Sequence, residues 1–155
     1  MAIKKTLSVS AIKDGTVIDH VTAGRALDIV RLLRLTQEKK QITLGLYLES
    51  RARGRKDLIK IEALELSTES ANRVALLAPG ATINIIKNYA VVKKFQVVIP
   101  QMIERLIVCP NPSCITNHER MISVFFVKNQ ATGIQLACKY CERLFRESDI
   151  QIYNP

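Results

Sequence analysis

The chain has 155 residues, of which 48% are hydrophobic, and it carries a formal net charge of +9 at pH 7. The apolar fraction favours a folded protein over a disordered one, and the length suits one ordinary domain or two small ones. No apolar run is long enough to cross a bilayer, and the first residues lack the apolar region of a signal peptide, so we expect a cytoplasmic protein without a membrane partner. The positive charge favours an anionic partner, which could be nucleic acid, a nucleoside phosphate or an acidic protein.

The N-terminal segment predicts two strands followed by a helix. Residues 6–12 alternate apolar and small polar side chains, and a turn at Lys13–Gly15 leads into a second β-rich run at residues 16–20. Thr22 stands where a helix N-cap is expected, because its hydroxyl can accept a hydrogen bond from the first helical turn. The apolar spacing that follows predicts a helix over residues 23–35.

A basic turn joins the next two predicted strands. Residues 41–48 alternate in polarity, which predicts a strand, and a further strand is expected over residues 56–61. Between them, residues 51–56 carry four cations in six positions. This turn is either a solvated hairpin tip or a loop that faces phosphate groups. In the strand predicted at residues 41–48, the apolar residues expected on one face are Ile42, Leu44, Leu46 and Leu48.

The following segment predicts a second helix and two more strands. Residues 67–77 predict a helix that begins on a capping hydroxyl and ends before a Pro-Gly pair. Residues 82–87 and 89–94 are β-rich runs broken at Asn88. The order β-α-β-β-α-β predicts an α+β fold, namely a ferredoxin-like antiparallel sheet with two helices on one face and the other face open to partners. Residues 97–102 would link this sheet to the C-terminal segment.

The four cysteines fall into two close pairs separated by 23 residues. The spacing, C-x4-C followed by C-x2-C, is typical of a zinc ribbon, in which four thiolates surround one Zn²⁺ ion as a closed structural site. Such a metal would stabilise a small zinc-ribbon-like β domain that buries little core by itself. The predicted zinc ligands are Cys109, Cys114, Cys138 and Cys141.

Three other interpretations of the cysteines fit less well. Disulfides form in oxidising compartments, and the sequence shows no signal peptide that would direct the chain to one. A redox C-x-x-C would leave the pair Cys109 and Cys114 unexplained. An iron–sulfur cluster is also held by four thiolates, so that alternative stays open on the sequence alone.

The remaining residues predict a binding protein rather than an enzyme. Phosphate-binding loops of the G-x-x-x-x-G-K-[ST] and G-x-G-x-x-G types are absent from the sequence, and His118 directly precedes Glu119, whereas zinc deaminases require an H-x-E spacing. A metal-dependent hydrolase would also need an open metal position. The main alternative is a zinc-ribbon protein that binds nucleic acid, but Trp is absent and only 5% of residues are aromatic, so few side chains could stack on bases.

Four blocks of sequence, in order over nearly the whole chain, resemble one family. They are AIKDGTVIDH at residues 11–20, GRKDLIKIE at residues 54–62, residues 81–92, and the cysteine segment at residues 109–142. Together they resemble the regulatory chain of aspartate carbamoyltransferase. The resemblance implies a noncatalytic chain with a nucleotide-binding allosteric domain at residues 1–99 and a zinc domain at residues 100–155 that docks onto the catalytic chain.

The resemblance also implies partners and effectors. Regulatory chains of this family form homodimers through the N-terminal domain, and three regulatory dimers bridge two catalytic trimers. The nucleoside triphosphates CTP and ATP, with UTP as a further candidate, shift the enzyme between states of low and high activity and so control pyrimidine biosynthesis.

The resemblance further implies site residues. Asp19 and Lys60 would hold the ribose and base, and His20 and Lys94 would meet the phosphates. Ser10 stands where other members carry an acidic residue, and the loop Arg51–Arg53 is more basic than expected, so the resemblance does not fix which nucleotide activates and which inhibits. The full effector set is Val9, Ala11, Ile12, Asp19, His20, Lys60, Asn84, Ile86, Tyr89, Val91 and Lys94. The surface toward the catalytic chain would consist of Asn111, Lys139, Tyr140, Glu142 and Arg143.

Overall fold

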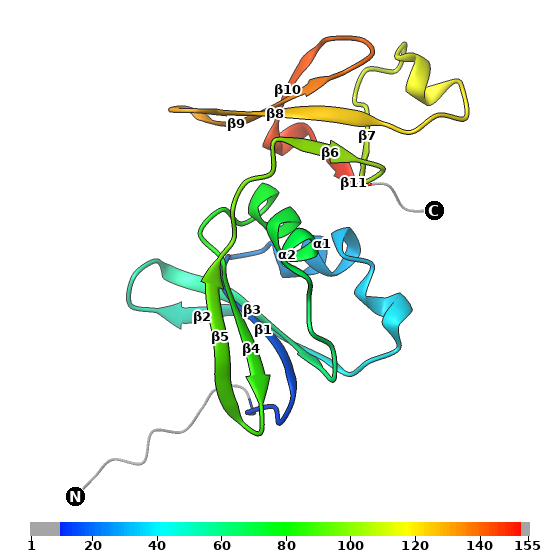
Figure 1. Ribbon diagram of the computed structural model, residues 1–155. Helices are drawn as coiled ribbons and strands as arrows, with labels where there is room; N and C mark the ends of the chain where they lie inside the picture. Colours follow the sequence, from blue (N-terminus) through cyan, green and yellow to red (C-terminus); the bar gives the residue numbers. More distant parts are fainter. Residues whose placement is uncertain (1–9, 153–155) are drawn as a thin grey trace, which may run out of the picture.

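The computed structural model describes residues 10–152 and contains two main antiparallel β sheets, one in each half of the chain (Figure 1). The larger sheet consists of β1 (Gly15–Thr22), β2 (Ile42–Ser50), β3 (Gly54–Glu62), β4 (Thr82–Lys87) and β5 (Ala90–Gln96). Its strand order is β2-β3-β1-β4-β5, and every neighbouring pair is antiparallel. The first four strands with their two helical crossovers have the ferredoxin-like arrangement, so the predicted fold is confirmed, with β5 added at one edge.

Two helical segments cover one face of this sheet. α1 (Ala26–Leu32) is followed by the 3-10 helix η1 (Leu35–Glu38), and α2 (Thr68–Arg73) continues as η2 (Val74–Leu76). Because side chains alternate along a strand, every second residue of the central strands faces the helices. Fully buried residues between the two layers include Ile29 and Val74 from the helices and Ile18, Ile59 and Ile83 from the strands.

Among residues 10–152, no helix is long and apolar enough to span a membrane.

α1 begins later than predicted, because a buried side chain from β3 caps it. Thr22 remains part of β1 and is not the N-cap. Instead the fully buried carboxylate of Asp57 accepts hydrogen bonds from the backbone N–H groups of Gly24 (2.9 Å) and Ala26 (3.0 Å). The N–H group of Ala26 is one of those that a helix leaves unpaired at its first turn, and Gly24 lies just before the N-cap residue Arg25. The helix also ends at Leu32, earlier than predicted.

The same carboxylate explains why β2 departs from strict alternation. The pairing register with β3 shifts between Gly45 and Leu48, so two residues of β2 bulge opposite Asp57. One of them, Tyr47, has a φ of 54° and donates its backbone N–H to Asp57 at 2.9 Å. The other, Leu46, was predicted to lie on the apolar face of the strand, but it is 44% exposed. The prediction of one continuous apolar face is therefore wrong beyond Gly45.

The strand predicted at residues 6–12 is absent from its described part, since residues 10–14 form neither helix nor strand. Residues 1–9 lie outside the described residues. The segment is instead held against the turn between β4 and β5, because the carbonyl of Lys13 accepts a hydrogen bond from the backbone N–H of Tyr89 (2.9 Å). The start of the chain therefore depends on a distant hairpin, which local alternation does not reveal.

The second helix and the hairpin after it follow the sequence more closely. Ser67 caps α2 by accepting a hydrogen bond from the backbone N–H of Ser70 at 3.2 Å. The last turn tightens from α to 3-10 geometry before the Pro-Gly pair ends it. Asn88 and Tyr89 both have positive φ (54° and 64°) and form the turn between β4 and β5, where the break was predicted.

The second half of the chain folds as a small β structure. β6 (Met102–Glu104), β8 (Val124–Gln130), β9 (Gly133–Cys138) and β10 (Leu144–Arg146) form a sheet in the order β10-β9-β8-β6. β7 (Ile107–Val108) pairs with β11 (Gln151–Ile152), and η3 (Ile115–Asn117) and η4 (Glu147–Asp149) are single turns. Ile107, Phe125 and Leu136 are almost completely buried and form its core. Below, residues 10–96 are called the N-terminal lobe and residues 102–152 the C-terminal lobe.

The two lobes pack against each other over α1 and α2, which lie between the large sheet and the C-terminal lobe (Figure 1). The connecting segment is held to the N-terminal lobe, because the backbone N–H of Val98 donates to the side-chain oxygen of Asn72 (2.9 Å). An ion pair between Arg25 and Glu147 (3.7 Å) joins the lobes directly. Burial raises the pKa of Glu147, and the nearby Arg25 opposes this rise. Apolar packing and ionic contact thus both position the lobes.

Candidate metal centre and effector face

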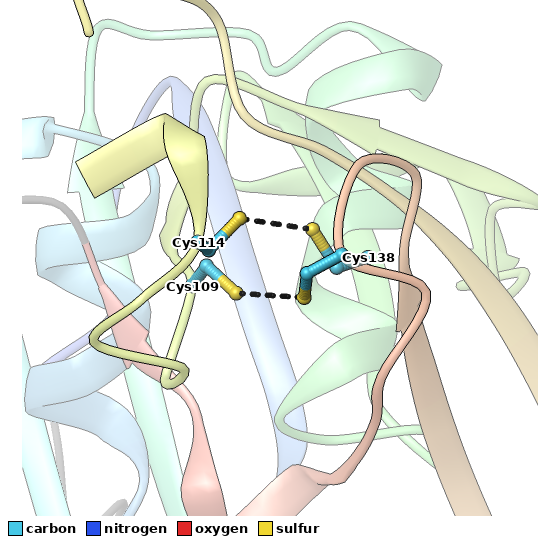
Figure 2. Close-up of side chains that lie close together, drawn as sticks. Cys109, Cys114 and Cys138 are labelled. Atoms are coloured by element: carbon cyan, nitrogen blue, oxygen red, sulfur yellow. Dashed lines mark hydrogen bonds between the residues drawn. The ribbon is translucent and has the colours of Figure 1, made fainter. Parts of the chain in front are cut away.

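The four cysteine sulfurs converge on one point in the C-terminal lobe. The Sγ atoms of Cys109 and Cys141 are 3.7 Å apart, as are those of Cys114 and Cys138, and all four lie within 4.8 Å of one another. Figure 2 shows the paired sulfurs facing each other across the gap between two loops. A disulfide would bring two sulfurs to about 2.05 Å, so disulfides are excluded. Four ligands at roughly 2.3 Å from a central Zn²⁺ ion would lie about 3.8 Å apart, which matches the two observed distances.

The first cysteine loop is shaped by two asparagines. The side-chain N–H group of Asn117 donates to the carbonyls of Cys109 (3.0 Å) and Asn111 (2.8 Å), which draws the two ends of the loop together. The backbone carbonyl of Asn111 also accepts a hydrogen bond from the backbone N–H of Cys114 (3.0 Å). The side-chain oxygen of Asn111 accepts one from the backbone N–H of Ser113 (3.1 Å). These contacts turn the chain so that both sulfurs of the loop point inward.

The second cysteine loop is a tight turn at the end of β9. The backbone N–H of Glu142 donates to the carbonyl of Cys138 (3.0 Å), and Glu142 has the positive φ of 61° that such a turn requires. Burial raises the pKa of the Cys138 thiol, while the backbone N–H groups of Cys141 and Tyr140 point at its sulfur and oppose the rise. Backbone donors aimed at a sulfur favour its thiolate form, which is the form that binds metal.

The sulfur cluster needs a cation to ionise fully. Burial raises the pKa of Cys109, whereas Cys114 is brought down to a pKa of about 7 because the Thr116 hydroxyl and backbone N–H outweigh the effect of burial. Four negative sulfurs this close would repel one another, so the thiols cannot all deprotonate without a positive charge between them. The space within 4.8 Å holds a single ion and is too small for a cluster of several irons and sulfides.

A second group of predicted residues lines up on the face of the large sheet that points away from the helices. Lys60 pairs with Val17, Val17 with Asn84, and Asn84 with Lys94, so these residues form one row across four strands. Ile18, one position along β1, faces the buried core instead. The strand pairing therefore brings together three predicted effector residues from distant parts of the chain. Asp19, Ile86 and Val91 lie on the same face by alternation and register.

The face that carries Lys60, Asn84 and Lys94 is called the effector face below. Its polar groups are already connected to one another. The ammonium group of Lys60, which is 8% exposed, donates to the carbonyl of Ser10 at 2.5 Å. Burial lowers the pKa of Lys60, and the charge of Asp19 opposes the change. Asp19 in turn forms an ion pair with Lys56 at 2.8 Å. Burial acts to raise the pKa of Asp19, but the hydrogen bonds from Lys56 and the His20 backbone bring it below its ordinary value.

His20 lies in a bulge of β1. The register with β3 shifts between Ile18 and Val21, and His20 has a φ of 54°. In a regular strand, neighbouring residues such as Asp19 and His20 point to opposite faces of the sheet, but that alternation is broken at this bulge. Within the described residues, Nδ1 of His20 is buried and has no hydrogen-bond partner. Arg53 from the basic turn donates to the carbonyl of His20 (3.2 Å).

The other predicted effector residues lie near the β4–β5 turn. The backbone N–H of Asn88 donates to the carboxylate of Asp14 (3.0 Å), so the segment before β1 and this turn lie side by side. Ile12 is buried and Ala11 is exposed, while Tyr89 and Val91 are 67% and 55% exposed. Val9 lies outside the described residues. The predicted effector set omits Arg53 and Lys56, although the sequence shows both in the basic run at residues 51–56. The ion pair of Lys56 with Asp19 joins residues that are distant in the sequence, so it became apparent only in the structure.

The predicted docking residues divide into two kinds. Asn111 is only 7% exposed, and its side chain serves its own loop. Lys139, Glu142 and Arg143 are exposed on the second cysteine loop, and Tyr140 is 37% exposed with the Lys139 ammonium group 5.9 Å from its ring centre. The docking role of all five residues stays a prediction.

Comparison with known proteins agrees with both parts of the structure. Residues 7–98 match the family model of the aspartate carbamoyltransferase regulatory chain, allosteric domain, and residues 101–151 match that of the metal binding domain of the same chain. The chain belongs to the family of aspartate carbamoyltransferase regulatory chains. It is therefore a noncatalytic, regulatory chain with an allosteric and a metal-binding domain, and its family implies association with catalytic chains.

Three relatives illustrate how close the match is. The aspartate carbamoyltransferase regulatory chain of Chromobacterium violaceum is 48% identical over 140 residues, which cover 90% of this chain and 92% of the relative. That of Aeromonas salmonicida is 46% identical over 147 residues, which cover 95% of this chain and 96% of the relative. That of Pyrococcus horikoshii is 44% identical over 146 residues, which cover 93% of this chain and 95% of the relative.

Membership in this family identifies the sulfur cluster as its structural metal centre. The four cysteines would hold one Zn²⁺ ion, whose charge stabilises the four thiolates. Four protein ligands fill a tetrahedral zinc site, which leaves no position for water or substrate. The regulatory chain thus uses its metal to fix two loops in place rather than to carry out chemistry.

Proposed function

We propose that this regulatory chain senses nucleoside triphosphates with its N-terminal domain, residues 1–99, and passes the signal to the catalytic chain through its zinc domain, residues 100–155. CTP, ATP and UTP are the candidate effectors, and the outcome is control of pyrimidine biosynthesis. The cytoplasmic location expected from the sequence stays a prediction.

The observation that carries the effector proposal is the row of Lys60, Asn84 and Lys94 on the open sheet face. The exposed ammonium group of Lys94 can bind phosphate oxygens as a point charge, whereas Lys60 and the side chain of Asn84 can form hydrogen bonds with the ribose and base. His20, with a ring nitrogen that has no partner in the described chain, lies on β1 next to Asp19. The exposed side chains of Tyr89 and Val91 offer apolar surface for a base at the other end of the face.

The docking proposal is supported by an apolar row on the outward face of the C-terminal sheet. Met102 pairs with Phe126, Phe126 with Ala137, and Ala137 with Leu144, so the four side chains lie side by side across β6, β8, β9 and β10. Met102, Phe126 and Leu144 are 48%, 43% and 53% exposed. Contiguous apolar residues on a surface mark sites of protein association. The row ends next to the predicted docking residues in the chain, because Leu144 follows Arg143 directly.

The proposed assembly has two catalytic trimers bridged by three regulatory dimers, with each dimer formed through the N-terminal lobe. The outer strand β2 supports this, because the edge strand carries the exposed side chains of Leu46 (44%) and Tyr47 (59%). An unpaired strand edge with apolar side chains is a template for pairing with a second copy. Sedimentation equilibrium that finds a monomer at assay concentrations would contradict the dimer.

Two neighbouring lysines provide a matched test of the effector face. Lys94 pairs with Asn84 on the open face, whereas Lys93 pairs with Ile85 on the opposite face. Replacing Lys94 with Ala should weaken the binding of CTP or ATP about 10- to 100-fold, since a hydrogen bond to a charged group contributes roughly 1.5–3 kcal/mol. Isothermal titration calorimetry on the zinc-loaded chain measures this. Lys93→Ala should bind as the wild type does, and equal affinity of both variants would refute the assignment of this face.

A further inference from the structure

A cavity lined by arginines lies at the junction between the lobes. Its volume is about 640 Å³, within the range of small-molecule sites in proteins. Arg34 lies on the N-terminal lobe between α1 and η1, whereas Arg105 lies in the turn between β6 and β7, and Arg120 follows η3. An adjoining cavity of about 340 Å³ shares Arg34 and Arg105. The two cavities together form a groove along the seam where the lobes meet.

The arginines of this cavity differ from others in the same region by having no acidic partner. Arg25 pairs with Glu147 and Asp28, and Arg31 pairs with Asp28. Within the described part of the chain, Arg34, Arg105 and Arg120 form no ion pair with a carboxylate, and all three are exposed.

The lining has a net positive charge and partly apolar walls. Glu119 is the single acidic residue among the residues that line the cavity, against three arginines. Ile107, Met121 and Ile122 form part of the wall, so the arginines share the cavity with apolar surface. Like charges brought together at one cavity repel one another, so an anion bound between them would relieve this repulsion.

We propose that this cavity is a second anion site, specific for a compact ligand with two or more negative phosphate charges. Guanidinium groups match phosphate oxygens with paired N–H donors, which is why arginine predominates where phosphate is bound in two-point contact. The cavity is separate from the effector face, because the helices that border it lie on the other face of the large sheet from Lys60 and Lys94.

Binding in this cavity would act on the position of the lobes. Arg34 belongs to the N-terminal lobe, and Arg105 and Arg120 belong to the C-terminal lobe, so one anion would bridge the two. A ligand that contacts both lobes at once favours the arrangement in which both contacts form, by a free energy that grows with the logarithm of its concentration over its dissociation constant. Anions at this seam would therefore influence how a signal passes from one lobe to the other.

The test uses inorganic pyrophosphate as the probe and the full, zinc-loaded chain. Calorimetric titration at constant ionic strength should show binding to the wild type, and Arg34→Gln, Arg105→Gln and Arg120→Gln should each weaken it about tenfold or more, which corresponds to the loss of one charged contact. Arg31→Gln is the matched control, because Arg31 is exposed on α1 and pairs with Asp28. That variant should bind pyrophosphate as the wild type does.

Two further measurements make the outcome decisive. Zinc content before and after each titration shows whether a variant or the probe has disturbed the metal. If Arg105→Gln loses zinc, Arg34→Gln, which lies on the lobe without the metal site, shows whether removal of an arginine weakens pyrophosphate binding. Lys94→Ala should leave pyrophosphate binding unchanged, even where nucleotide binding is lost. The proposal is overturned if the wild type does not bind pyrophosphate, or if the three arginine variants bind it as tightly as the wild type does. It is also overturned if Lys94→Ala abolishes pyrophosphate binding, because the anion would then occupy the effector face.

Discussion

At the scale of single residues, the four cysteines and Asp57 show what sequence can and cannot reveal. The cysteine ligands could be predicted because each pair lies within one short loop and its spacing alone defines a metal site. Asp57 could not, because the groups that it binds, the N–H groups of Gly24 and Ala26, lie 33 and 31 residues away. A buried aspartate in a β run has no local pattern that marks it as a helix cap.

Replacing Asp57 with Ala should lower the free energy of unfolding by about 2–4 kcal/mol. The substitution leaves the buried N–H group of Ala26 and the partly buried N–H groups of Gly24 and Tyr47 without their acceptor, and an unpaired buried group costs about 1–3 kcal/mol before the structure relaxes. Urea unfolding followed by circular dichroism measures the loss. Asp28→Ala is the control, because its ion pairs are on the surface and should contribute less than about 1 kcal/mol. Equal stability of the two variants would contradict the capping role.

The Asp19–Lys56 ion pair should make stability depend on pH at the acid end. Because the folded pKa of Asp19 lies below its unfolded value, its contribution is complete above the unfolded pKa of about 3.8 and is lost as the pH falls through the folded value. In Lys56→Ala, burial without the partner raises the pKa of Asp19, so unfolding by acid should begin at higher pH than in the wild type. Chemical denaturation across pH 2–6 tests this, and superimposable pH profiles would exclude the coupling.

At the scale of elements, sequence periodicity predicted the order of strands and helices but not their irregularities. Strands β3, β4 and β5 and helix α2 lie close to their predicted positions, because their apolar spacing and caps are local features. The bulges at His20 and at Tyr47 both face β3, and they exist because of pairing between strands that are distant in sequence. The effector face shares this origin: its residues are adjacent only through the register of the sheet.

The apolar row of the C-terminal sheet leads to a prediction about docking. Phe126→Lys should weaken binding to the catalytic chain about tenfold or more, because the side chain would otherwise bury apolar surface in the complex. The free energy of unfolding of the chain should fall by only about 1–2 kcal/mol, because Phe126 is 43% exposed in the free chain and the Lys stem covers part of the surface that the ring leaves. Surface plasmon resonance with immobilised catalytic trimer measures the affinity. The control is Lys128→Ala, also exposed on β8, and an unaltered affinity in Phe126→Lys would remove the row from the interface.

At the scale of the whole molecule, the arrangement of the two lobes was beyond the reach of the sequence. A hydrogen bond from Val98 to Asn72 holds the predicted linker, residues 97–102, against α2. An ion pair between Arg25 and Glu147 further joins the lobes. These contacts link surfaces that carry no periodic pattern. They also offer a physical route by which a ligand on one lobe can change the position of the other, since an effector acts only by favouring one arrangement over another.

Zinc removal from the complete complex provides the decisive measurement for the role of the C-terminal lobe. When the regulatory chain is mixed with catalytic trimers and the mass of the assembly is measured, zinc-loaded chain should form the bridged complex. Chelation should dissociate it, because metal binding and the folding of the cysteine loops are one equilibrium. The Cys141→Ser variant should fail to assemble in the same way. A complex of undiminished mass after complete loss of zinc would contradict the proposal that the metal-bound lobe holds the catalytic chain.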